Sequence, residues 1–85
     1  MSVEIDVLYF AWLRERTGTG RERVATEAPT VSALVDELRA RGERFEAAFA
    51  DLGAVRVAVD QELAGLDAPL AGAREVAFFP PMTGG

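Results

Sequence analysis

One amphipathic helix constrains the fold of this chain more than any other feature of the sequence. After Pro29, apolar residues recur at the i, i+3, i+4 and i+7 spacing of a single helix face, and they are Val31, Leu34, Val35 and Leu38. Thr30 is placed to cap this helix, and Gly42 is placed to end it. Because the helix has one apolar stripe, it must bury that stripe against other elements of the chain.

Segments with strand patterns lie on both sides of this helix and predict a sheet as its packing partner. Residues 3–10 alternate, with Val3, Ile5, Val7 and Tyr9 on one face. Other strands are expected at about 22–26, at 55–61, as a short edge strand within 62–70, and at 75–79. Shorter helical segments are expected at 11–16 and 43–50. One helix covers only one face of such a sheet, so we predict an α+β domain with an open sheet face.

Composition excludes several classes of function. The chain has 85 residues, enough for one core, with no Cys and no His, and all nine basic residues are Arg. Thiolate nucleophiles, zinc–thiolate sites, a histidine base and Schiff-base lysines are therefore absent, and we expect neither catalytic residues nor a metal. The net charge of −5 disfavours nucleic acid and anionic membranes. The longest apolar run, residues 7–13, is too short to span a bilayer, so a cytoplasmic protein is expected.

The last residues, FFPPMTGG at 78–85, direct attention to the C-terminus. Proline has no N–H to donate to a sheet, so Pro80 and Pro81 should end the last strand. The remaining residues are Met82, Thr83, Gly84 and Gly85. We therefore predict a domain at 1–81 and a flexible diglycine tail at 82–85. Because glycine has no side chain, two final glycines suit a terminal carboxylate that enters a narrow channel and reacts after activation to an acyl adenylate. The alternative is a frayed chain end without function.

Four segments of the chain resemble a known family. They are VLYFAWLRERTG at 7–18, APTVSALVDEL at 28–38, VAVDQ at 57–61 and EVAFFPPMTGG at 75–85. In order and spacing they resemble the small subunit of molybdopterin synthase, a ubiquitin-like sulfur carrier with the β-grasp fold. The resemblance covers nearly the whole chain and implies a mixed sheet of four to five strands packed on one main helix. Asp60 departs from an expected Asn, and Ala73-Arg74 replaces an expected Gly-Asp.

The resemblance implies a sulfur-donating subunit that is not itself an enzyme. An ATP-dependent, E1-like enzyme would adenylate Gly85, and a sulfur donor protein would convert the adenylate to a thiocarboxylate. The tail would then enter the large synthase subunit, with Gly84 keeping the approach slim, and donate sulfur to cyclic pyranopterin monophosphate. Catalytic residues are expected on the large subunit, in a heterotetramer. The glycyl adenylate and the thiocarboxylate are covalent intermediates, and no bound cofactor is implied.

The β-grasp fold also implies a partner surface beside the tail. First and last strands lie side by side and parallel in that fold, so if Phe78 faces the helix, then Phe79, Leu8 and Phe10 face the open side. These three residues are the expected interface, and the alternative is that loops of the chain cover them. Arg14 matches a family position and is expected to meet an acidic partner group, unless it is only a solvated helix arginine.

Three other functions stay open on the sequence alone. A carrier of the same chemistry could serve thiamine or cysteine biosynthesis. A ubiquitin-like modifier would conjugate its C-terminus to lysines of target proteins, and a β-grasp binding module would leave its tail idle. The absence of Cys favours a carrier that holds sulfur on its backbone terminus, because no side chain of this sequence offers a thiol.

Overall fold

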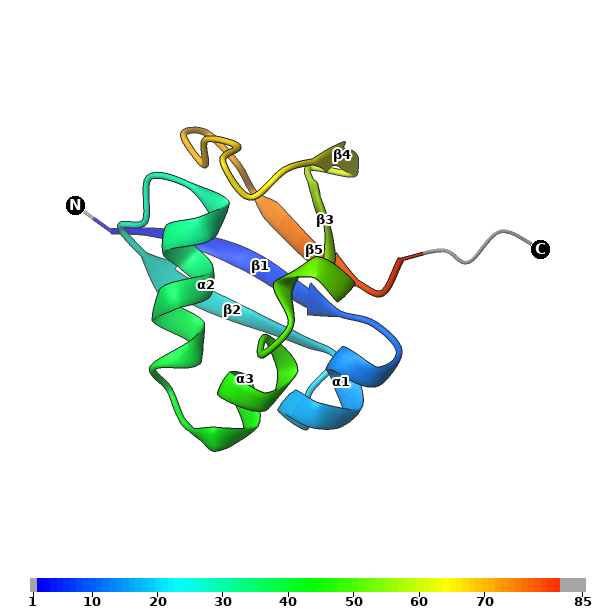
Figure 1. The fold of residues 1–85 in the computed structure, drawn as a ribbon. Helices are drawn as coiled ribbons and strands as arrows, with labels where there is room; N and C mark the ends of the chain where they lie inside the picture. The colour runs from blue at the N-terminus through cyan, green and yellow to red at the C-terminus, as the bar shows by residue number, and fades with distance from the viewer. Residues whose placement is uncertain (1, 82–85) are drawn as a thin grey trace.

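A computed structural model describes residues 2–81, which form one sheet with helices packed on it (Figure 1). Met1 and the predicted tail at 82–85 lie outside the described residues. In chain order the elements are β1 (Val3–Tyr9), α1 (Trp12–Thr17), β2 (Arg21–Thr26), α2 (Val31–Arg39), α3 (Glu43–Ala48), the 3₁₀ helix η1 (Leu52–Ala54), β3 (Arg56–Val59), β4 (Glu62–Ala64) and β5 (Glu75–Phe79). All the strands and helices predicted from the sequence are present, and η1 is an element that the sequence pattern did not predict.

The five strands form one mixed sheet in the order β2-β1-β5-β3-β4. The central strands β1 and β5 are parallel, with Val7 opposite Val76 and Tyr9 opposite Phe78. The other neighbouring pairs are antiparallel. Because β2 and β4 stand at the two ends of the strand order, they form the edges of the sheet. The predicted mixed sheet and the side-by-side arrangement of first and last strands are confirmed. Within residues 2–81, no helix combines the length and apolar character needed to cross a bilayer.

The core lies between one face of the sheet and α2, which crosses that face in Figure 1. The predicted apolar stripe of α2 is fully or almost fully buried at Val31, Leu34, Val35 and Leu38. It meets the inward side chains of the sheet, which include Ile5, Val7, Tyr9, Val57, Val76 and Phe78. Burying each large side chain contributes about 1.5–3 kcal/mol, so this two-layer core supplies most of the driving force for folding.

The start of α2 is as predicted, whereas its end is not. The Thr30 hydroxyl accepts a hydrogen bond from the Ala33 N–H at 3.2 Å, which satisfies a free donor of the first turn. The helix ends at Arg39, and its C-terminal cap is Ala40, not Gly42. Gly42 instead precedes α3 with φ of 150°, a backbone angle that favours glycine. The prediction that Gly42 ends α2 was therefore wrong, because this glycine serves the turn between two helices.

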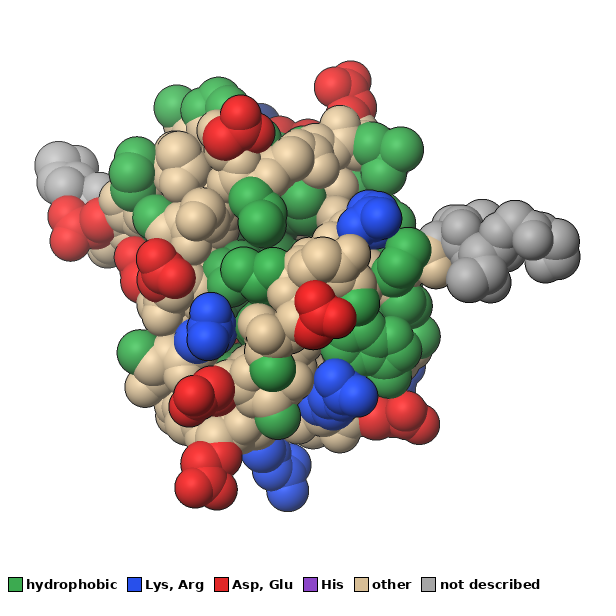
Figure 2. All heavy atoms as spheres, in the orientation of Figure 1, with side chains coloured by type: hydrophobic (Ala, Val, Ile, Leu, Met, Phe, Trp, Pro, Cys, Tyr) green, Lys and Arg blue, Asp and Glu red, His purple; other side chains and the backbone are tan. Residues whose placement is uncertain are grey.

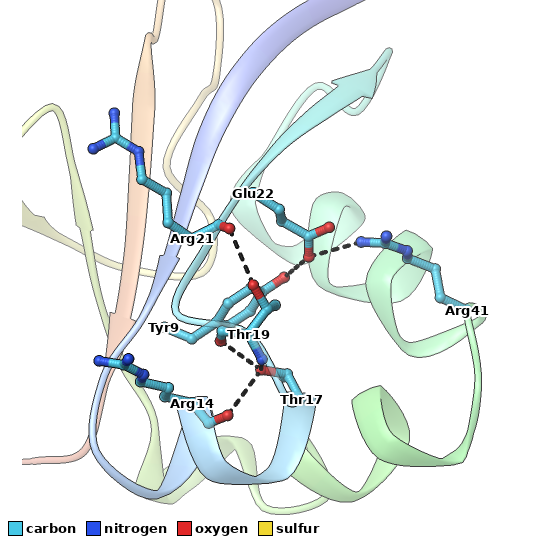
Figure 3. A network of polar contacts seen from close by, with 7 residues as sticks. All are labelled: Tyr9, Arg14, Thr17, Thr19, Arg21, Glu22 and Arg41. Atoms are coloured by element: carbon cyan, nitrogen blue, oxygen red, sulfur yellow. Dashed lines mark hydrogen bonds and ion pairs between the residues drawn. The ribbon is translucent and has the colours of Figure 1, made fainter.

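Tyr9 joins the end of β1 to the helices on the core side of the sheet. Its ring packs edge-on against Phe45 and almost parallel to Phe78, with centroid distances of 6.1 and 6.2 Å. Its hydroxyl donates to the Glu22 carboxylate at 2.8 Å, and Arg41 donates to the same oxygen at 2.9 Å (Figure 3). Burial, followed by the Glu22 hydrogen bond, raises the pKa of Tyr9. Tyr9 is therefore a neutral donor that helps to fix β1 against β2 and α3.

Asp60 connects the β3–β4 turn to the start of β5. It occupies the left-handed region with φ of 50°, which Asp tolerates better than most residues. Its Oδ1 accepts the backbone N–H groups of Arg74 and Glu75 at 2.9 and 3.0 Å, and its own N–H donates to the Glu75 carbonyl. Asp60 and Ala73-Arg74 are the two departures from the family pattern, and they are in contact. The Asp60 carboxylate accepts the backbone N–H of Arg74.

We expect Asp60→Ala to lower the free energy of unfolding by about 1–3 kcal/mol, since it removes two hydrogen bonds and places alanine in the left-handed region. Asp60→Asn is the matched control, because its amide oxygen can accept the same two N–H groups and Asn tolerates this backbone angle. Urea unfolding of the three proteins at neutral pH measures the difference. Equal losses for the Asn and Ala variants would contradict the assigned role of the acceptor oxygen.

Candidate functional site

The described chain ends at the base of the predicted tail. β5 stops at Phe79, and Pro80 and Pro81 follow, both half-buried and outside any strand. This agrees with the expectation that residues without an N–H end the strand. The residues predicted to react or to reach the partner's channel, Met82, Thr83, Gly84 and Gly85, lie outside the described residues. Their role stays a prediction. The structure describes the surface next to Pro81, after which these residues follow in the sequence.

The parallel pairing of β1 and β5 brings two aromatic residues together beside this exit. The Phe10 N–H donates to the Phe78 carbonyl at 3.1 Å, which continues the ladder one step past β1. Phe78 is fully buried on the core side, where its ring meets that of Phe49 edge-on at 4.9 Å. Strand alternation then turns Phe79 and Phe10 to the open side, where Phe79 is half-buried and Phe10 is 47% exposed.

An apolar row crosses the open face next to these aromatics. Leu8 of β1 lies opposite Ala77 of β5. Ala77 in turn lies opposite Ala58 of β3. Ala58 lies opposite Leu63 of β4. Leu63 is 80% exposed, the highest value among the large apolar side chains of residues 2–81. We call these side chains, together with the two outward aromatics, the open-face patch: Leu8, Phe10, Ala58, Leu63, Ala77 and Phe79.

Three members of this patch, Leu8, Phe10 and Phe79, are residues that the family resemblance predicted to form an interface. The structure brings them to one face, and the chain's own loops leave almost half of Phe10 accessible. Leu63 was missed. Its strand was foreseen as a short edge strand, but its side became evident only from the pairing of Leu63 with Ala58. An apolar surface of this kind is typical of a protein contact, and the interface role of these residues stays a prediction.

Arg14 lies on α1, which follows β1 directly and therefore sits near the patch. Its side chain passes over Gly20, where an added Cβ would lie 3.1 Å from the Arg14 Nε atom. Two threonine hydroxyls stabilise the turn between α1 and β2. The Thr17 hydroxyl donates to the Thr19 carbonyl at 3.0 Å, and the Thr19 hydroxyl donates to the Arg21 carbonyl at 3.0 Å. In Figure 3 the guanidinium groups of Arg14 and Arg21 extend away from Arg41. Arg14 is exposed and available to an acidic group, a role that stays a prediction.

Among residues 2–81, no three His, Cys, Asp or Glu side chains gather closely enough to hold a metal ion. Figure 2, which shows the helix side, has charges of both signs scattered among hydrophobic side chains. The open-face patch belongs to the opposite side of the sheet from α2. The described residues therefore place an apolar surface on the open face of the sheet, with Phe79 directly before Pro80 and Pro81.

Comparison with known proteins places the chain in a family. The ThiS family model matches residues 7–85. The molybdopterin synthase sulfur carrier subunit of Escherichia coli is 47% identical over 81 residues, which cover 95% of this chain and 99% of that protein.

Two solved structures share the fold over nearly their whole length. The small archaeal modifier protein 1 of Haloferax volcanii superposes with a TM-score of 0.74 at 28% identity, over 94% of this chain and 99% of that one. A putative molybdopterin converting factor subunit 1 from Pyrococcus furiosus superposes with a TM-score of 0.72 at 26% identity, over 95% and 100% of the two chains. The β-grasp fold inferred from the resemblance is thereby confirmed, and the chain belongs to the ThiS family, together with the sulfur carrier subunits of molybdopterin synthase.

Proposed function

We propose that this chain carries sulfur as a thiocarboxylate on Gly85 for the biosynthesis of the molybdenum cofactor. One observation carries the proposal: the molybdopterin synthase sulfur carrier subunit of Escherichia coli is 47% identical to this chain over 95% of its length. The family match also extends through residue 85 and so includes both final glycines. The composition agrees, because a chain without Cys has no side-chain thiol on which to hold transferable sulfur.

The chemistry begins at the carboxylate of Gly85. One oxygen of this carboxylate attacks the α-phosphorus of ATP within an activating enzyme, and pyrophosphate leaves. The carboxylate thereby becomes an acyl adenylate. A sulfur atom at the oxidation level of sulfide, supplied by a donor protein, then displaces AMP from the carbonyl carbon. The product is a thiocarboxylate, whose sulfur bonds to carbon of cyclic pyranopterin monophosphate inside the large synthase subunit. Water then cleaves the bond between this sulfur and the Gly85 carbonyl carbon, which leaves the sulfur on the pterin and regenerates the Gly85 carboxylate. The chain contributes the reactive terminus and its presentation, and the large subunit contributes the catalytic residues.

The open-face patch supplies the surface that the large subunit grips. The Escherichia coli relative is named as a subunit, which implies an assembly with another chain. In the present chain, apolar side chains cross the open face from β1 to β4, and Phe79 directly precedes Pro80. Phe10 is 47% and Leu63 80% exposed. Docking through this patch sets the position from which the tail enters the partner. Because Pro81 to Gly85 can span about 16–18 Å when extended, the terminus can reach a site well inside that partner.

A second function, protein modification, is favoured by one specific observation. A solved chain of the same fold at 28% identity is named a small archaeal modifier protein. Modifier and carrier share the same activated C-terminus and differ in the acceptor, which is a lysine amine in one case and sulfide in the other. Higher identity to the synthase subunit, 47% against 28%, leads us to favour the carrier.

Intact-mass spectrometry separates these functions. The purified chain is incubated with its activating enzyme, ATP and a sulfur donor, and a sample without ATP is the control. A carrier gains the mass difference between sulfur and oxygen only when ATP is present. Isopeptide-linked products would identify a modifier instead, and an unchanged mass under all conditions would overturn both proposals in favour of a binding module with an idle tail.

A further inference from the structure

Arg56 is a charged residue that lies directly beside the open-face patch. The start of β3 lies next to the end of β5, and Arg56 is the cross-strand partner of Phe79 (Figure 1). Val57 is buried in the core, so strand alternation turns Arg56 to the open side, as it does Ala58. Side chains of directly opposite residues start only about 4.5–5.5 Å apart. Arg56 is therefore the charged neighbour of the patch at the end where Pro80 follows Phe79.

The backbone before β3 holds the guanidinium group of Arg56 in place. Its Nη1 donates to the Gly53 carbonyl at 3.0 Å and to the Val55 carbonyl at 3.3 Å. Gly53 belongs to η1, and the Asp51 carboxylate fixes the start of η1 by accepting the Gly53 N–H at 3.1 Å. Ordering a long side chain on binding costs about 0.5–1.5 kcal/mol. Because the Arg56 head group is already anchored, much of this cost is met before a partner arrives.

The anchored guanidinium keeps one side of its donor fork unused. The carbonyls of Gly53 and Val55 both accept from Nη1. Within residues 2–81, the N–H groups of Nε and Nη2 of Arg56 have no acceptor, and the residue is exposed. The planar fork of an arginine matches the two oxygens of a carboxylate, which can accept two parallel hydrogen bonds from it. The Nε–Nη2 side of Arg56 is therefore available to one carboxylate.

No acid among the described residues neutralises this arginine. The ion pairs within residues 2–81 belong to other arginines, and none includes Arg56. Glu75 shares the open face, but it lies at the other end of β5 from Phe79, about 13 Å along the strand. Asp51 is the acid nearest in sequence, and it accepts the Gly53 N–H instead of pairing with Arg56. The end of the patch beside Arg56 thus carries positive charge, although the whole chain carries −5.

Docking on the patch changes the surroundings of Arg56. A protein that covers Phe79 also removes water from the neighbouring guanidinium group, because the two side chains are cross-strand partners. Removing water from a charge is costly unless the charge is paired and hydrogen-bonded. The two carbonyls that Arg56 already contacts are neutral and cannot supply the opposite charge. A partner surface that fits this end of the patch must therefore present a carboxylate next to its apolar contact.

We propose that Arg56 binds a carboxylate of the large synthase subunit and thereby selects the orientation in which that subunit covers the open-face patch. The inference rests on the proposed function, because it takes the large subunit as the occupant of the patch. It adds a residue that neither the sequence pattern nor the family resemblance singled out. Arg14 follows Phe10 on α1, whereas Arg56 adjoins Phe79 on β3, so the two arginines belong to different ends of the aromatic pair. A charge at one end of an apolar surface distinguishes between otherwise similar orientations.

Isothermal titration of the full chain with the isolated large subunit, at two salt concentrations, tests the proposal. In about 0.1 M NaCl, Arg56→Glu is expected to weaken binding about 20-fold and Arg56→Gln about fivefold. In about 1 M NaCl, where the screening length falls to about 3 Å, both losses should shrink to about threefold or less. A role of Arg56 in supporting η1 alone would give losses that do not depend on salt, and thermal unfolding of the variants reports that role directly.

Arg74→Glu is the matched control, since it makes the same change of charge at an exposed arginine before the far end of β5. Its affinity should stay within about twofold of the original. The inference is overturned if Arg56→Glu binds as tightly as Arg74→Glu while Phe10→Asp still weakens binding, or if the loss is the same at both salt concentrations. Failure of the proposed function is seen separately, as the absence of thiocarboxylate formation or of any binding by the unaltered chain, and the latter overturns this inference as well.

Discussion

A chain that lacks only Gly85 is expected to fold like the full chain and to lose at least about 100-fold in sulfur transfer. Removing one residue draws the terminal carboxylate back by about 3.3–3.6 Å. Since a misplacement of 1 Å at a reacting centre can cost about 100-fold, the shortened tail should not reach either the activating enzyme or the pterin productively. Dithiolene formation in a reconstituted synthase measures the loss.

The matched control for this truncation is Thr83→Ala, which keeps the full length of the tail and both final glycines. We expect it to retain most of the activity, because the reactive carboxylate stays at the same distance from the domain. Circular dichroism and thermal unfolding of both variants should match the full chain, since the packed core lies within residues 2–81. Full dithiolene formation by the chain without Gly85 would refute the assignment of the terminal carboxylate as the sulfur-carrying group.

The second large effect concerns docking. Phe79→Asp is expected to weaken association with the large synthase subunit by about 30-fold or more, because it places a charge in the middle of an apolar contact. Isothermal titration with the isolated large subunit measures the dissociation constant. Phe79 is half-buried, so its replacement also tests the stability of β5. Phe10→Asp changes the same surface at a side chain that is 47% exposed, and we expect a similar loss of binding with little change in folding.

Val3→Asp provides the matched control for both aromatic variants. Val3 is an apolar residue with 55% of its surface exposed, at the opposite end of β1 from Phe10. An aspartate there adds the same charge without touching the open-face patch, so binding should stay within about twofold of the original. If Phe10→Asp bound the large subunit as tightly as Val3→Asp does, the open-face patch would not be the docking surface.

Under the proposed function, the open-face patch and the tail have separate roles. The patch is a rigid surface on paired strands, and its orientation is set by the buried ring of Phe78 and the Phe10–Phe78 hydrogen bond. In that proposal, contacts of the patch bind the partner, whereas the reaction takes place at the C-terminus. The two sets of variants therefore separate two quantities: patch variants should change affinity, whereas the Gly85 truncation should change the reaction within the complex.

Local features of the fold followed from the sequence alone. The stripe of Val31, Leu34, Val35 and Leu38 predicted α2, and Thr30 predicted its cap, because helix periodicity and capping involve residues only a few positions apart. The proline pair likewise predicted where β5 ends. The family resemblance, rather than periodicity, supplied the parallel pairing of the first and last strands, which the structure confirms.

Tertiary structure decided what depends on residues far apart in the chain. Gly42 has the residue type of a helix end, but the docking of α3 gave it a different turn. Leu63 joined the open-face patch only through the register of β4 on β3, and Asp60 gained its role only when β5 came beside the β3–β4 turn. The position of Arg56 beside Phe79 likewise follows from the pairing of β3 with β5. Neighbouring residues encode backbone preference and face, whereas strand partners are selected by the packing of the whole core.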